Sequence, residues 1–90
     1  PKLSKEEARN ILLSMDYSSA KVILVIQGIH EKGVASPSVC TVVALGRRDA
    51  KDVEIRQPFY YDSELGWFWF ETSPQMVRIW NRDGYREIKR

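Results

Sequence analysis

The chain has 90 residues, of which 43% are hydrophobic and 29% charged, and its formal net charge at pH 7 is +2. This length and composition predict a single globular domain and exclude a disordered tail, a collagen-like repeat and a disulfide-bonded scaffold. One cysteine and one histidine can form neither an intrachain disulfide nor a four-ligand zinc site of those residue types, so we expect no metal and no cofactor.

The first predicted element is a helix over residues 4–15. Ser4 is placed to cap the free backbone N–H groups, and Glu7, three residues later, completes a capping box. Four apolar side chains then recur at helical spacing: Ala8, Ile11, Leu12 and Met15. This spacing predicts one buried stripe along the helix.

Residues 20–32 and 36–48 fit two different structures. Their length favours helices, and Ser36-Pro37 supplies an N-cap followed by a proline at the first helical position. Their density of valine and isoleucine favours strands, because branched side chains pack well on a pleated sheet. We interpret both segments as helices. The alternative makes residues 21–29 and 38–46 strands, which gives one helix on a six-stranded sheet.

From residue 53 onward the sequence predicts antiparallel strands. Residues 53–61 alternate between apolar and polar side chains, and residues 67–71 are rich in aromatic side chains. The run from Asn81 to Gly84 predicts a tight hairpin turn, because Gly84 accepts the positive φ that other residues resist. Short connections between neighbouring strands imply a meander.

These elements predict an α+β fold in a single domain over residues 1–90. Residues 1–48 are expected to be mainly helical, and these N-terminal helices are expected to pack on a C-terminal antiparallel β-meander over residues 53–90. Small or apolar residues surround a glycine turn between the second and third expected helices: Ile29, Gly33, Val34, Val39 and Val42. This pattern resembles the helix–turn–helix of the winged-helix family over less than half of the chain, although Lys32 stands where that family buries an apolar residue. The resemblance implies that residues 36–48 enter the major groove of DNA and that the strands after them form the wing.

Outward-facing hydroxyl and guanidinium groups are the candidates for nucleic-acid binding, because they contact phosphates and base edges. In the third expected helix these residues are Ser36, Ser38, Thr41, Arg47 and Arg48. In the last hairpin they are Arg78, Arg82 and Arg86, within a segment that has five basic and two acidic residues. The alternative for that segment is a solvated edge whose charges discourage aggregation.

Nine of the ten aromatic residues lie between Phe59 and Tyr85. Strand alternation puts Trp67 and Trp69 on one face of the sheet and the two phenylalanines of the same strand on the other. One face must cover the helices, and the other then needs a second layer, a partner chain or a ligand. The candidates for partner binding are Tyr60, Trp67, Trp69 and Trp80. Stacking of unpaired bases and ordinary cross-strand packing are the alternatives.

The sequence does not indicate an enzyme. Cys40 and His30 are the only thiol–imidazole pair, and both lie on segments expected to pack apolar faces. The chain also has no glycine-rich phosphate loop and no metal-binding spacing. No apolar run approaches the roughly 20 residues that cross a bilayer, so we expect no membrane contact, and the unpaired cysteine suits the cytoplasm.

The sequence therefore predicts a DNA-binding or regulatory accessory protein of winged-helix type, with double-stranded DNA as the partner. A homodimer would hide the second aromatic face. The alternative is a protein–protein adaptor or dimerisation module that docks through the face of Trp67 and Trp69. The DNA-binding prediction depends on a helical backbone at residues 39–45.

Overall fold

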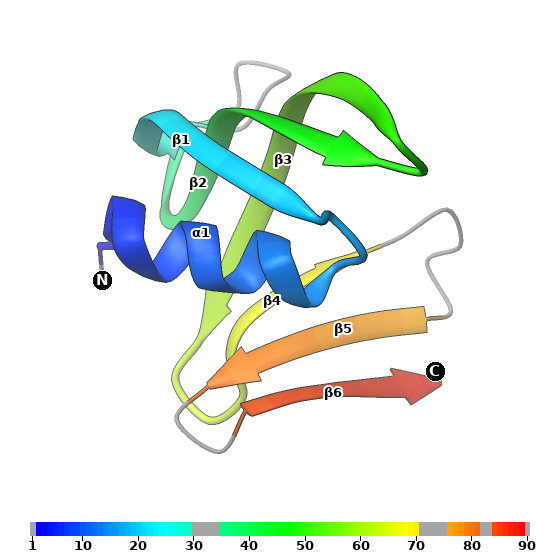
Figure 1. Cartoon of the computed structure of the whole chain (residues 1–90). Helices are drawn as coiled ribbons and strands as arrows, with labels where there is room; N and C mark the ends of the chain where they lie inside the picture. Colours follow the sequence, from blue (N-terminus) through cyan, green and yellow to red (C-terminus); the bar gives the residue numbers. More distant parts are fainter. Residues whose placement is uncertain (1, 30–34, 71–75, 82–83, 90) are drawn as a thin grey trace.

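The structure is a computed structural model that describes residues 2–29, 35–70, 76–81 and 84–89. One helix precedes six strands: α1 (Lys5–Ser14), β1 (Ser19–Ile29), β2 (Ala35–Arg48), β3 (Lys51–Asp62), β4 (Gly66–Phe70), β5 (Met76–Asn81) and β6 (Gly84–Lys89). Each strand pairs antiparallel with the next one, so the sheet has the order β1-β2-β3-β4-β5-β6 (Figure 1). The architecture is one helix packed on a curled meander.

Helix α1 confirms the first predicted element. The Ser4 hydroxyl accepts a hydrogen bond from the backbone N–H of Glu7 at 3.0 Å. The predicted stripe is also buried, and it consists of Ala8, Ile11, Leu12 and Met15. Local capping and spacing were sufficient to predict this element because a helix satisfies its hydrogen bonds within its own segment.

The two helices expected over residues 20–32 and 36–48 are strands β1 and β2, so the predicted winged-helix-like fold is wrong. The described part of residues 1–48 holds one helix and two strands. Val25 pairs with Val42 in the β1–β2 ladder, and residues 39–45 lie entirely within β2. Branched side chains pack well on a pleat, and pairing of the two segments outweighed the helix-start signal at Ser36-Pro37. The alternative of one helix on a six-stranded sheet is the observed arrangement.

The pairing of β1 with β2 is irregular at two points. The register shifts between Val22 and Leu24, which makes Ile23 the extra residue of a bulge. A second shift lies between Gln27 and Ile29, where Gly28 has a φ of 77°. Glycine adopts this backbone conformation without the steric cost that a side chain imposes. Bulges increase the local twist of a strand pair.

The C-terminal meander confirms the expectation from the sequence. Asn81 pairs with Gly84 at the last hairpin, and Gly84 has a φ of 103°. The β2–β3 hairpin was not predicted as such. It turns at Asp49 and Ala50, whose φ values of 52° and 62° match the pattern of a type I′ turn.

The hydrophobic core lies between α1 and the sheet. Three buried helix residues, Ala8, Ile11 and Leu12, belong to the same cluster as side chains from β1 to β4. The strand residues in this cluster are Ala20, Cys40, Val42, Ala44, Ile55, Phe59, Trp67 and Trp69. One face of the sheet is therefore closed by the helix, and we call the opposite face the outer face.

Candidate docking surface

Alternation along β3 and β4 assigns the aromatic side chains to the two faces. Phe59 and Trp69 belong to the core under α1, whereas Tyr60 and Phe68 are paired in register on the outer face. The predicted separation of the two tryptophans from the two phenylalanines of β4 is confirmed. The face that covers the helix is the tryptophan face.

The tryptophans predicted to bind a partner are core residues. Trp67 is 5% exposed and Trp69 is 0% exposed. The ring of Trp69 lies edge-on to Phe59, with 5.3 Å between the ring centroids, and Trp67 lies edge-on to Tyr61 at 5.2 Å. Trp80 is half-buried against the same core. A docking surface on the face of Trp67 and Trp69 is thus not exposed, because α1 already covers it.

The outer face carries a small aromatic cluster. Tyr60 stacks on Phe68, with ring centroids 5.5 Å apart, and it meets Phe70 edge-on at 5.8 Å. All three rings are half-buried. Ile79 pairs with Phe68 on the same face and is 0% exposed. This end of the outer face is therefore already packed.

Among the residues whose burial the structure describes, the exposed large hydrophobic side chains of the outer face lie at the β1–β2 pair. Leu24 pairs with Val43, and two residues further along β2 lies Leu45, beside Lys21 of β1. Leu24 is 49% exposed and Leu45 is 47% exposed, whereas Val43 between them is half-buried. We call Leu24, Val43 and Leu45 the leucine patch. Ile23, the bulge residue next to the patch, is 48% exposed.

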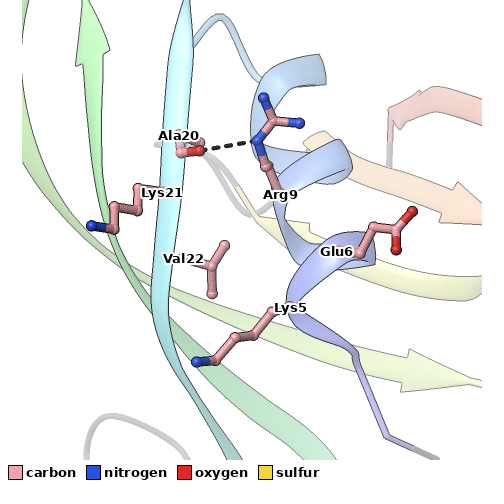
Figure 2. Close-up of a pocket in the computed structure, with 6 residues that line it drawn as sticks. All are labelled: Lys5, Glu6, Arg9, Ala20, Lys21 and Val22. Atoms are coloured by element: carbon pink, nitrogen blue, oxygen red, sulfur yellow. Dashed lines mark hydrogen bonds between the residues drawn. The ribbon is translucent and has the colours of Figure 1, made fainter.

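Helix α1 lies next to part of the free edge of β1. Arg9 of α1 donates a hydrogen bond from Nε to the carbonyl oxygen of Ala20 at 3.2 Å (Figure 2). Figure 2 also shows that Val22 points into the space between helix and strand, whereas Lys21 points away from α1. This view agrees with the register, which puts Lys21 on the outer face beside Leu45.

Three of the arginines predicted to contact nucleic acid have partners within the fold. Arg47 forms an ion pair with Asp52 at 2.7 Å, and Arg78 forms one with Glu87. Arg48 donates to the carbonyl oxygen of Met15 at 2.9 Å and lies 4.0 Å above the centroid of the Tyr17 ring. These groups bind carboxylates, a carbonyl and a ring rather than extending freely toward a phosphate.

The remaining candidates are Ser36, Ser38, Thr41, Arg82 and Arg86. Ser38 is exposed on β2, but Thr41, which was expected to face outward, is 1% exposed. Ser36 and Arg86 lie in β2 and β6, and their side chains lie outside the described residues, as does the whole of Arg82. Because β2 is a strand, the helix that was predicted to present these residues to the major groove is not formed.

The thiol of Cys40 is not arranged for chemistry. Cys40 is fully buried in the core, and this burial raises the pKa of its thiol to about 12. The thiolate, which is the reactive form, is therefore strongly disfavoured at neutral pH. His30 lies outside the described residues. Within the described ranges, no three His, Cys, Asp or Glu residues gather into a group that could hold a metal ion.

Comparisons of the chain with protein-family models, with curated proteins and with solved structures found no match. Among the residues that the structure describes, no helix is long and apolar enough to cross a membrane.

Sequence reasoning missed the leucine patch because the helix interpretation of residues 36–48 hid it. A signal was present in the sequence. Read as a strand, residues 42–45 place Val42 and Ala44 on one face and Val43 and Leu45 on the other, so both faces are apolar. A strand that is apolar on both faces needs cover on both sides.

Proposed function

We propose that this chain is a non-enzymatic protein-binding module that docks a partner on the outer face of its sheet, at the leucine patch. One observation carries the proposal: the large hydrophobic side chains that are exposed among the described residues gather at one place on the β1–β2 pair. They are Ile23, Leu24 and Leu45. Clustered exposure of this kind marks interaction sites, whereas singly scattered apolar residues need no explanation.

The free energy of burial supports a docking role. An antiparallel sheet with one solvated face normally alternates hydrophobic side chains toward the core with polar ones toward water. On β2 this alternation is replaced by apolar side chains on both faces, with Ala44 in the core and Leu45 half exposed. Full burial of a leucine contributes about 1.5–3 kcal/mol, so covering the leucine patch would supply a substantial part of a binding free energy.

Charged residues border the patch. Lys21 and Glu54 are the register partners of Leu45 on β1 and β3, and Arg56 is the β3 partner of Val43. All three side chains are exposed. An apolar centre with a charged and polar rim is the usual composition of a protein–protein interface.

Binding to duplex DNA has less support than docking of a protein. The expected recognition segment is strand β2, and its two arginines bind Asp52 and the carbonyl oxygen of Met15. To contact DNA, the guanidinium groups of both arginines would have to leave their partners within the chain and bind phosphates instead. Such phosphate contacts weaken as salt increases. In a gel-shift titration with mixed-sequence duplex at two salt concentrations, we expect no salt-dependent complex.

Site-specific crosslinking tests the docking surface. A photoreactive amino acid replaces Leu45 in one variant and Asn10, an exposed residue of α1, in a matched control. In cells that express the chain, the Leu45 position should give a discrete adduct that disappears when Leu24→Lys is added, and the Asn10 position should not. Identical adducts from both positions, or none from the Leu45 position, would contradict the proposed docking surface.

A further inference from the structure

One row of side chains across the outer face has opposite charges on either side of a leucine. Lys21 on β1 and Glu54 on β3 are both register partners of Leu45 on β2. Adjacent strands are about 4.8 Å apart, so the two charges flank Leu45 at one strand spacing on each side. Both side chains are exposed, and neither forms an ion pair with another of the described residues.

The neighbouring row has a similar asymmetry. Leu24 on β1 and Arg56 on β3 are the register partners of Val43 on β2. The β1 side of this row is thus apolar, and the β3 side ends in a guanidinium on a long aliphatic stem. An arginine stem covers apolar surface well while its charged end remains in water.

We infer that the partner on the leucine patch is a second copy of this chain, packed face to face about a two-fold axis that runs along β2. The inference rests on the proposed docking function and names its partner. A rotation about this axis brings Leu45 of one copy against Leu45 of the second copy and exchanges the β1 side for the β3 side. Lys21 of each copy then lies against Glu54 of the other, which gives two equivalent ion pairs in one isologous interface.

The same rotation brings Leu24 of each copy against the stem of Arg56 of the other. The β2 strands of the two copies become nearly aligned, which is the common arrangement for two sheets that pack face to face. In these two rows the charge pattern is therefore complementary to itself, and this property favours a second copy over an unrelated partner.

Packing of faces is favoured over pairing of edges at this end of the sheet. α1 lies against β1, and Arg9 already binds the carbonyl oxygen of Ala20 on its edge (Figure 2). A second copy that added a strand there would have to displace this contact. The outer face needs no such rearrangement.

Charge reversal at the two rim positions tests the inference. We expect wild-type chain to sediment as a dimer, and Lys21→Glu and Glu54→Lys each to weaken the dimer by about tenfold or more, because each variant opposes like charges twice in the interface. An equimolar mixture of the two variants should regain the wild-type affinity, since every pair in the heterodimer is then complementary. The chain that carries both substitutions should also dimerise like the wild type.

A second set of variants tests the apolar centre. Leu45→Lys should give a monomer, whereas Asn10→Lys, which adds the same charge on α1, should leave the dimer intact. Circular dichroism confirms that each variant keeps its fold. Because the substituted side chains are exposed, no loss of secondary structure is expected.

The outcomes separate this inference from the proposed function. A wild-type chain that stays monomeric up to about 1 mM, where complexes of about −4 kcal/mol still form, overturns the homodimer. A dimer unaffected by Leu45→Lys, or variants that fail to rescue each other, also overturns it. If the crosslinker at Leu45 then gives an adduct other than twice the mass of the chain, the docking function stands without the homodimer. If it gives no adduct, both fail.

Discussion

Both faces of this sheet carry large apolar side chains, yet the two faces differ in what covers those side chains. The face toward α1 holds Phe59 and Trp69, each without exposed surface, with their rings in edge-on contact. The outer face leaves Leu24 and Leu45 about half exposed at one end and packs Tyr60 on Phe68 at the other. The side-chain pattern of a strand therefore shows which of its faces are apolar. Only the position of α1 shows which of those faces the chain itself buries.

Large-to-small substitutions are expected to show the largest difference between the two faces, measured as the loss in free energy of unfolding. Trp69→Ala should lower the free energy of unfolding by about 3–5 kcal/mol, because it leaves a cavity in a packed core. Leu45→Ala should lower it by less than about 1 kcal/mol in the monomer, because half of the side chain is already in water. Chemical denaturation at low protein concentration measures both values.

Trp69→Phe is the second variant to use if Trp69→Ala fails to fold, since it keeps an aromatic ring against Phe59. Equal losses for Trp69→Phe and Leu45→Ala would indicate that α1 does not close the tryptophan face. The proposed difference between the two faces would then not hold.

Backbone packing on the core face predicts the next effect. A Cβ added at Gly46 would lie 2.6 Å from the carbonyl oxygen of Ser19 and 2.9 Å from Cδ1 of Ile55. Gly46→Ala should therefore force β1 away from β2 and lower the free energy of unfolding by about 1–3 kcal/mol, as is typical of overpacking. Thermal unfolding and amide exchange in β1 check this expectation. An unchanged melting temperature would mean that the two strands are not in such close contact.

Alanine substitutions of the consecutive residues Arg47 and Arg48 should differ by a smaller amount in their loss of stability. Arg48→Ala should cost about 1–2 kcal/mol, because it removes the hydrogen bond to Met15 and the contact with the Tyr17 ring. Arg47→Ala removes an exposed ion pair with Asp52 and should cost less than about 1 kcal/mol. Denaturation at low and high salt separates them, since only the exposed pair is screened. A larger loss of stability for Arg47→Ala than for Arg48→Ala would contradict the stronger role given to Arg48.

The smallest effect is a dependence on pH. The folded thiol of Cys40 has a pKa raised to about 12 by burial, whereas an unfolded cysteine ionises at about pH 8.5. The unfolded chain thus loses this proton first, so the contribution of Cys40 to stability is complete below about pH 8.5 and declines between about pH 9 and pH 12. Urea unfolding of the wild type and of Cys40→Ala at pH 8 and pH 10 measures how much more steeply the stability of the wild type falls with pH. Parallel pH profiles would show that the thiol is not buried.

Residues near each other in the sequence account for the elements that were predicted correctly. Ser4 and Glu7 mark the start of α1, and Gly84 marks the last hairpin, because capping and turn geometry depend on a few neighbouring residues. The separation of Trp69 from Phe68 likewise follows from strand alternation alone. These features need no information about distant parts of the chain.

The valine-rich segments depended on long-range contacts. The side chains of residues 20–32 and 36–48 satisfy a helical stripe and a strand equally well, so their local pattern leaves both structures open. The two segments are strands because they pair with each other, as Val25 does with Val42. These residues are too far apart in the sequence for a local pattern to reveal the pairing. Packing of α1 then buried Trp69 and left Leu45 exposed, because a single helix can cover only one face of a sheet.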